Sequence, residues 1–361
     1  MYIHNRLENK SNFFQKIKQI DYILLISILI LGMVSIVTMY STDGGQVLFY
    51  TKSHLIKFLI FSVLMLIISF FNIRLWFSIS YFAYLILVLM LILTINFGVT
   101  ASGSQRWMDL YFINIQPSEL MKIAIILCLA KYFHRMRLEN VNSFYSIIIS
   151  LIIIFVPMSL VIIQPDLGTS ILISISGIIV LWFVGLNHKY FFYSFLKPYQ
   201  KLRILTFLNP DRDPLGAGYQ IIQSKIAVGS GGLTGKGFLK GTQSYLEFLP
   251  EKHTDFIFTL FSEEFGFLGS LFLLLIYAVI IYRIILIGSI SRSYFAKIFC
   301  YSFGSAIFVF ITINMFMVLG MLPIVGSPLP IMSYGGSSML ATMIGFGIVL
   351  SAKIHSQQSI A

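Results

Sequence analysis

Long runs of apolar residues alternate with short polar segments along almost the whole chain. A helix needs about twenty predominantly apolar residues to cross a bilayer. The runs therefore predict an all-α, polytopic helical bundle with nine spans: Tyr22–Tyr40, Leu55–Phe71, Leu75–Phe97, Leu120–Phe133, Phe144–Ile163, Gly168–Leu186, Gly266–Ile287, Ile298–Met321 and Ser338–Ser351. No soluble domain or internal repeat interrupts this pattern. We expect one transmembrane domain over residues 1–361.

The composition agrees with a membrane protein and excludes a soluble globule. Hydrophobic residues make up 57% and charged residues 11% of the chain, whereas soluble domains carry about a quarter charged residues. The formal charge is +11. Because the Lys and Arg residues are scattered between apolar runs, this charge favours membrane topology over nucleic-acid binding. Cys128 and Cys300 lie inside apolar runs, and we expect them to pack there.

The basic residues predict which loops face the cytoplasm, because short cytoplasmic loops concentrate Lys and Arg. Lys16 places the N-terminus on that side, and Arg74 places the loop between the second and third predicted spans there. The first helix is expected to act as a signal anchor. Arg292 and Lys353 place the loop near residue 290 and the C-terminus there as well. Residues 198–254 are then predicted to form a large extracytoplasmic loop.

This assignment requires one more crossing than the apolar pattern supplies. Between Lys189, predicted inside, and Pro198, predicted outside, the chain offers only the apolar run Tyr190–Leu196. At about 1.5 Å per residue, this run covers roughly 10 Å of an apolar core about 30 Å thick. We therefore expect residues 187–208 to form a strained or re-entrant connection, with the 198–254 loop still outside.

Asp255 is the leading candidate for a functional residue. The segment Phe248–Ser262 places a cluster of ionisable groups against the start of a long apolar helix. A carboxylate at a membrane surface loses solvation, so its position is costly unless it serves a function. Further along this helix, Glu263 and Glu264 are expected to project to different sides and to join a polar network between helices. Few histidines and no nearby cysteine argue against zinc, whereas a carboxylate-bound Mg²⁺ or Mn²⁺ that assists a diphosphate stays open.

The run Gly229–Gly237 superficially resembles a phosphate loop. It lacks the Walker A spacing, because Ser230 stands where the first glycine is needed and Gly237 follows Lys236. A turn-rich surface segment is the favoured interpretation. Lys236 and Lys240 remain candidates for binding a diphosphate, because an ammonium group suits phosphate oxygens.

Other polar segments flank the predicted spans. Glu119 and Lys122, at positions i and i+3, can pair on one helix face, which is compatible with either helix packing or a catalytic role. Arg106 and Trp107 fit an interfacial anchor or a phosphate contact equally. Asp166 is expected to cap a helix. Residues 326–338 are rich in Pro and Gly, which is costly at lipid depth unless the segment lines a cavity.

Six motifs, in this order along nearly the whole chain, resemble the SEDS family of bacterial cell-wall proteins (shape, elongation, division and sporulation). They are Gln116–Glu119, Gln164–Thr169, Asn209–Gly216, Gln223–Gly232, Phe248–Phe258 and Ser333–Ser337. The run Gly241–Ser244 leading into Phe248 is similar to the elongation members rather than the division members.

The resemblance implies a peptidoglycan glycosyltransferase with ten spans in the bacterial inner membrane, with both termini cytoplasmic. The implied substrate is lipid II, a disaccharide-pentapeptide on undecaprenyl diphosphate. Asp255 matches the family's proposed catalytic residue. The implied partners are a class B penicillin-binding protein transpeptidase and other membrane proteins of the elongation complex, and no nucleic acid. The chain is short where the family's seventh helix is expected.

The implied chemistry is compatible with the residues. Joining a sugar hydroxyl to an anomeric carbon that bears a diphosphate requires a base and positive charge for the leaving group. Asp255 is the candidate base. Candidates for substrate binding are Arg106, Trp107, Glu119, Lys122, Lys236 and Lys240. Two alternatives stay open, namely a lipid II transporter that performs no chemistry and an inactive, shortened scaffold.

Overall fold

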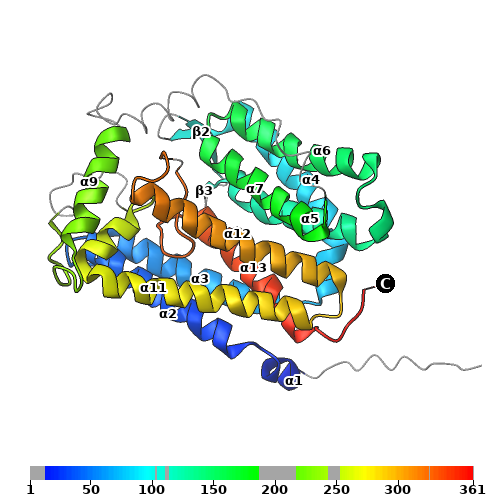
Figure 1. Ribbon diagram of the computed structural model, residues 1–361, viewed down its shortest axis with the longest axis horizontal. Coiled ribbons are helices and arrows are strands. Elements are labelled where there is room, and N and C mark those ends of the chain that lie inside the picture. Colours follow the sequence, from blue (N-terminus) through cyan, green and yellow to red (C-terminus); the bar gives the residue numbers. More distant parts are fainter. Residues whose placement is uncertain are drawn as a thin grey trace, which may run out of the picture.

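The computed structural model describes residues 13–101, 104–109, 114–186, 217–242, 253–324 and 326–360. Figure 1 shows long helices packed side by side along one axis. The helices are α1 (Phe13–Lys18), α2 (Tyr22–Thr42), α3 (Phe49–Phe70), α4 (Ile73–Phe97), α5 (Pro117–His134), α6 (Phe144–Ile163), α7 (Leu167–Val184), α9 (Ala217–Ser230), α11 (Ile257–Ile290), α12 (Tyr294–Val318) and α13 (Gly336–Ile354). A short 3₁₀ helix spans Leu138–Asn140.

The prediction of a polytopic helical bundle is confirmed. Within the described ranges, eight helices are long and apolar enough to cross a membrane: α2, α3, α4, α6, α7, α11, α12 and α13. The remaining predicted span, Leu120–Phe133, corresponds to α5, which has 18 residues but carries Glu119, Lys122 and Lys131. Helices α4, α6, α7, α12 and α13 surround α5, and its three charged residues are buried. This enclosure allows α5 to carry charges that a lipid-facing helix could not.

Three short strands add a small antiparallel sheet that the apolar pattern did not predict. Strands β1 (Val99–Ala101), β2 (Ser104–Asp109) and β3 (Asn114–Ile115) are ordered β1-β2-β3. They lie between α4 and α5, and β2 packs against both helices. The sheet positions Arg106 and Trp107 next to the bundle.

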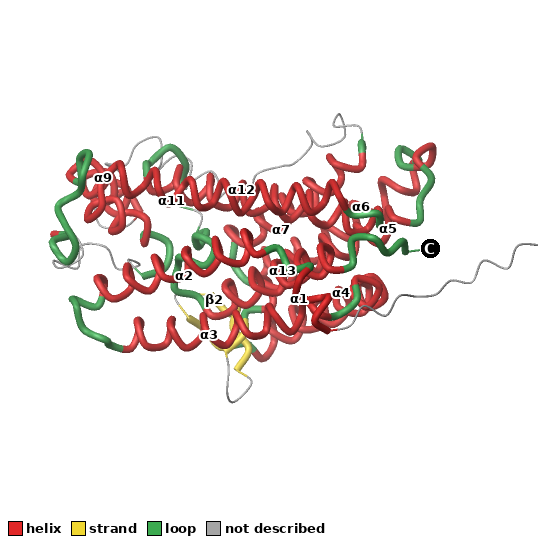
Figure 2. The backbone as a smooth tube through the Cα atoms, turned by 90° about the horizontal axis from the view of Figure 1, so that it is seen from below, coloured by secondary structure: helices red, strands yellow, loops and turns green. Residues whose placement is uncertain are grey.

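The loops gather at two opposite ends of the bundle. At one end, Lys16 Nζ donates to Phe70 O at 3.3 Å, Arg74 to Ser359 O at 3.3 Å, and Arg292 N to Ser356 O at 2.8 Å. At the other end lie α9 and the segment between α12 and α13 (Figures 1 and 2). The loop at residue 292 therefore shares an end with α1, the α3–α4 turn and the C-terminal tail. This arrangement agrees with the charge-based assignment of sides, although the connecting residues 187–216 lie outside the described residues.

Two helices begin earlier than their apolar runs indicate. Helix α3 starts at Phe49 rather than Leu55, and α11 starts at Ile257 rather than Gly266. In both helices the added turns are polar but turned into the bundle, since His54 and Glu263 are buried. Hydropathy detects the part of a helix that faces lipid, so the apolar runs omit these interior-facing ends. For α11, the expected helix start near Asp255 is confirmed.

Helix α11 is broken at Gly266, where φ is 65° and ψ is −161°. Residues 231–242, which we call the glycine segment, form backbone hydrogen bonds with α11 on both sides of this break. Lys236 N and Gly237 N donate to the carbonyls of Glu263 and Glu264 at 3.0 Å each. In the other direction, the N–H groups of residues 267 and 268 donate to the carbonyls of residues 232 and 233 at 2.9 and 3.1 Å.

The close approach of these two backbones requires glycine. A Cβ on Gly235 would lie 2.0 Å from Glu264 O, and a Cβ on Gly266 would lie 2.3 Å from Gly235 N. Both residues also have positive φ. The Gly-rich run is therefore a backbone partner of a broken helix, and it satisfies polar groups that the break exposes.

Residues 326–335, which we call the proline segment, also enter the bundle without helical structure. Side chains satisfy its backbone: Tyr277 donates to Pro330 O at 2.7 Å, and Ser333 Oγ accepts from Leu329 N at 2.7 Å. Ser35 Oγ lies 3.0 Å from Met332 O. Irregular backbone at membrane depth is tolerated where such partners exist or where it lines a cavity.

Candidate functional site

Asp255 lies in the turn that precedes α11 and is half-buried. A Cβ on Gly326 would lie 3.5 Å from its Oδ2, so the carboxylate adjoins the start of the proline segment. Asn314 of α12 fixes this contact, because its Nδ2 donates to Asp255 O at 3.0 Å and to Ser327 O at 2.6 Å. Asn314 is fully buried. One amide therefore holds the candidate base and the proline segment together.

The two residues before Asp255 are fixed as well. Tyr334 N donates to His253 O at 2.8 Å, and Ser333 Oγ donates to Thr254 O at 2.6 Å. The imidazole of His253 stacks on Tyr50, with ring centroids 3.9 Å apart, and its Nδ1 lies 3.0 Å from Thr42 Oγ1. These contacts from α2, α3 and the proline segment hold the turn in place, so the Asp255 position is preorganised.

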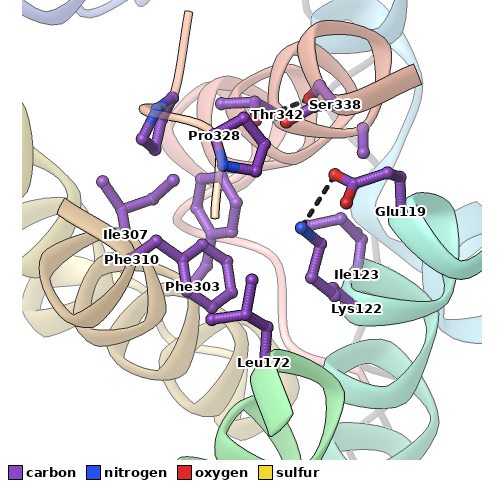
Figure 3. Close-up of a pocket in the computed structure, with 12 residues that line it drawn as sticks. Glu119, Lys122, Ile123, Leu172, Phe303, Ile307, Phe310, Pro328, Ser338 and Thr342 are labelled. Carbon is purple, nitrogen blue, oxygen red and sulfur yellow. Dashed lines mark hydrogen bonds and ion pairs between the residues drawn. The ribbon is translucent and has the colours of Figure 1, made fainter. Parts of the chain in front are cut away.

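Glu119 and Lys122 form the ion pair that their spacing predicted, with Nζ and Oε2 2.7 Å apart and both side chains buried. The Lys122 ammonium also lies 5.0 Å from the centroid of the Phe310 ring. The pair forms part of the wall of a pocket (Figure 3). The pocket is lined by Glu119, Lys122, Ile123, Leu172, Phe303, Ile307, Phe310, Pro328, Pro330, Ser338, Ala341 and Thr342.

Pro328, Pro330 and Ser338 contribute to the wall of this pocket, so part of the Pro- and Gly-rich stretch 326–338 lines a cavity. Figure 3 shows Pro328 across the pocket from the paired Glu119 and Lys122. Because Gly326 adjoins Asp255, the proline segment connects the candidate base to the pocket.

Arg106 extends from β2 and pairs with Asp166, with Nη1 and Oδ2 3.2 Å apart. Asp166 caps α7 as expected, because its Oδ1 accepts from Thr169 N at 3.2 Å. Gln116 links this cluster to α13, since its side chain donates to Asp166 at 3.0 Å and its backbone N donates to Ser337 Oγ at 2.8 Å. Trp107 is half-buried next to Arg106.

The lysines of the glycine segment have a different setting. Lys236 Nζ lies 2.6 Å from Oε1 of Glu263, which is fully buried and also accepts from Thr242 N and Thr242 Oγ1 at 2.9 Å each. Lys240 is exposed. Glu264 instead accepts from Ser41 of α2. The expected polar network of the two glutamates is therefore present, and it projects to two sides.

Sequence reasoning missed three polar residues of this region: Lys57, Asn314 and Tyr334. Lys57 and Asn314 lie within long apolar runs, and a charged or amide side chain in such a run is itself a signal. Tyr334 lies in a motif that the sequence did identify. Among the described residues, no group of three His, Cys, Asp or Glu side chains converges to hold a metal ion. Cys128 and Cys300 are free and buried, as expected.

Known proteins share both the sequence and this architecture. The chain is 39% identical over 365 residues to the peptidoglycan glycosyltransferase MrdB of Escherichia coli (strain K12), with 96% of each chain covered. It also matches a chain of a solved structure that describes the coordination of polymerization and crosslinking by a peptidoglycan synthase complex. That match has a TM-score of 0.80 and 27% identity, and covers 94% of this chain and 99% of the other.

The crystal structure of the rod shape determining protein RodA of Thermus thermophilus has the same fold. The TM-score is 0.71 at 24% identity, with 94% of this chain and 98% of the other covered. These similarities confirm the expected resemblance to the elongation members, and they identify the chain as a multi-pass membrane protein. Residues 15–358 match the cell cycle protein family of FtsW, RodA and SpoVE. The chain therefore belongs to the FtsW, RodA and SpoVE family of cell cycle proteins.

Proposed function

We propose that this chain is a peptidoglycan glycosyltransferase that polymerises lipid II, with Asp255 as the general base. The observation that carries the proposal is the position of Asp255 in a fixed turn beside Gly326. Gly326 begins the proline segment, which also lines the pocket of Glu119 and Lys122. The likeness to MrdB, which is named a peptidoglycan glycosyltransferase, supports the same reaction class.

In the proposed reaction, a sugar hydroxyl attacks the anomeric carbon of the donor with inversion. The new bond joins the hydroxyl oxygen to that carbon, and the bond from the carbon to the diphosphate oxygen breaks. Asp255 accepts the hydroxyl proton, and the diphosphate leaves with the bonding electron pair on the lipid carrier. A half-buried carboxylate suits this role because it retains access to substrate while its backbone is held in place.

The leaving diphosphate requires positive charge. Lys122 and Arg106 are our leading candidates for this role, because Lys122 lines the pocket and Arg106 pairs with Asp166, which Gln116 connects to α13. Glu119 would then orient Lys122, and Trp107 would contact the sugar or the diphosphate. Lys236 and Lys240 are weaker candidates, because neither lines the pocket beside the proline segment and both belong to the glycine segment that bonds to α11.

We also propose that the enzyme works in the bacterial inner membrane, with its termini in the cytoplasm, in complex with a class B penicillin-binding protein and other elongation proteins. The contacts that bring α1, the α3–α4 turn and the C-terminal tail to one end support this orientation. The likeness to a chain of a peptidoglycan synthase complex supports a cross-linking partner. Co-purification of a transpeptidase from native membranes would test the assembly.

The direct test is incubation of the purified full chain with lipid II in detergent, alone and with an added class B penicillin-binding protein, followed by separation of the glycan products. Polymer formation in either mixture supports the proposal, and its absence from both mixtures, with a chain that remains monodisperse, contradicts it. The same assay separates the enzyme from a transporter or an inactive scaffold, because neither would join sugars. If polymer forms only after a class B penicillin-binding protein is added, the partner is an activator as well as a cross-linker.

A further inference from the structure

Lys57 is a half-buried cation that, among the described residues, forms no ion pair. It lies eight residues into α3, one of the helices long and apolar enough to span the membrane. The cations predicted from sequence differ in this respect, because Arg106, Lys122 and Lys236 each have a carboxylate partner: Asp166, Glu119 and Glu263, respectively.

The contacts of Lys57 are neutral. Its Nζ donates to the hydroxyl of Tyr334 at 3.1 Å and lies 4.4 Å from the centroid of the same ring. Ser53 Oγ, one turn earlier on α3, is 3.2 Å from that hydroxyl. A phenol can accept a hydrogen bond and offer a ring face, but it carries no charge to offset the half-buried ammonium. Three polar side chains therefore converge around the Tyr334 hydroxyl.

A further feature increases the positive potential there. Lys57 Nζ lies 3.7 Å from the position that a Cβ on Gly336 would occupy. Gly336 is the first residue of α13, a helix of 19 residues that no side chain caps at this end. The N-terminal end of a helix carries partial positive charge, so an ammonium beside it is unfavourable unless an anion is near both.

The position of Lys57 also relates it to the candidate base. The backbone of Tyr334 bonds to His253 O, two residues before Asp255. On α13, Ser338 contributes to the pocket of Glu119 and Lys122, while Gly336 faces Lys57. The first turn of α13 therefore lies between the pocket and Lys57. An anion bound at Lys57 would lie beside the proposed reaction site without using the ion pairs already formed there.

We propose that Lys57, together with the Tyr334 hydroxyl, binds a diphosphate ester at membrane depth. The identity of that ester as the diphosphate of the lipid-linked sugar donor or of the released carrier rests on the proposed function. Phosphate oxygens suit a compact ammonium. Tyr334 positions the ammonium, and the diphosphate supplies the negative charge that the described protein groups lack.

The test measures binding separately from catalysis. Undecaprenyl diphosphate and undecaprenol, which lacks the anion, are titrated into the purified full chain in detergent, and the ligand-induced shift in melting temperature is recorded. The wild-type chain should bind the diphosphate lipid more tightly than the alcohol. Lys57→Gln should weaken diphosphate binding about ten- to hundredfold, as expected for one charge-assisted contact, and should leave alcohol binding unchanged. Lys57→Arg should retain part of the preference.

Matched variants and a soluble competitor sharpen this result. Lys52→Gln removes an exposed lysine five residues earlier on the same helix, and binding should be unchanged. Tyr334→Phe should weaken diphosphate binding less than Lys57→Gln does. Inorganic diphosphate should compete with the lipid in the wild-type chain but not in Lys57→Gln. If inorganic diphosphate alone stabilises the chain with the same dependence on Lys57, the site recognises the anion without the lipid, which also supports the proposal.

Equal diphosphate binding by Lys57→Gln and the wild-type chain would overturn the proposal, and so would an equal loss of diphosphate and alcohol binding, which would indicate altered packing. These outcomes are distinguishable from failure of the proposed function. A chain that makes no glycan from lipid II but still shows Lys57-dependent diphosphate binding would refute the polymerase and retain the site. A polymerase whose KM for lipid II is unaffected by Lys57→Gln would retain the activity and refute the site.

Discussion

The glycine segment and the proline segment both bond to the bundle without helical structure, but they satisfy their backbones differently. The glycine segment bonds main chain to main chain with the broken helix α11. The proline segment is held by side chains from α2, α11 and α12. In the glycine segment, the backbone groups of residues 232, 233, 236 and 237 are therefore engaged by α11. The side-chain contacts leave the other face of the proline segment free to line a pocket and to adjoin Asp255.

This difference indicates which irregular segment serves structure and which serves function. Any non-helical backbone at membrane depth must have hydrogen-bond partners, so irregularity alone does not mark a site. The Gly-rich run only superficially resembles a phosphate loop, and its backbone N–H groups at residues 236 and 237 donate to α11 carbonyls. The proline segment, which has no such motif, lies next to the candidate base, the pocket and Lys57.

The largest effect is expected on the side of the proline segment. Asp255→Asn keeps the shape of the side chain but removes its basicity, so glycan synthesis from lipid II should fall by at least about 10²-fold if this group is the general base. The variant should be expressed at the wild-type level and should keep the wild-type melting temperature. Asp43→Asn is the matched control, because Asp43 is half-buried at the same end of the bundle and accepts hydrogen bonds from Thr51. Near-normal synthesis by Asp255→Asn would remove the assignment.

The Glu119–Lys122 pair provides the second comparison, because it lines the pocket next to the proline segment. Either Glu119→Gln or Lys122→Met should lower the unfolding free energy by about 3–5 kcal/mol, since a buried charge loses its partner. The double variant should recover most of that stability. If the pair also contacts substrate, activity should not recover with it. A double-mutant cycle in thermal stability and in glycan synthesis measures both terms, and simple additivity in stability would contradict the buried pair.

For the glycine segment, the expected effect is on folding. Gly235→Ala places a Cβ 2.0 Å from Glu264 O at a residue with φ of 80°, so we expect a loss of about 2 kcal/mol or more. Gly229→Ala is the control, because no atom lies within 4 Å of its Cβ position in helix α9. Melting temperatures of the purified variants decide the point. A Gly235→Ala chain as stable as Gly229→Ala would show that the close backbone contact is absent.

Much of the bundle could be predicted because lipid-facing helices are read directly from apolar runs. The same reasoning placed Asp255 at a helix start and paired Glu119 with Lys122, since both depend on local spacing. The partners of the glycine segment could not be predicted, because its hydrogen bonds reach about thirty residues along the chain to α11. Lys57 was missed for a related reason, since its contact with Tyr334 joins residues 277 positions apart.

The smallest expected effects separate the two lysines of the glycine segment. Lys236→Met should cost about 1 kcal/mol, because the fully buried Glu263 loses its cation but keeps its bonds from Thr242. Lys240→Met should change stability by less than about 0.5 kcal/mol, since the side chain is exposed. If this segment serves the fold alone, both folded variants should keep the wild-type KM for lipid II. A tenfold higher KM in Lys240→Met, at unchanged melting temperature, would show instead that the glycine segment contacts the substrate, and the division between the two segments would fail.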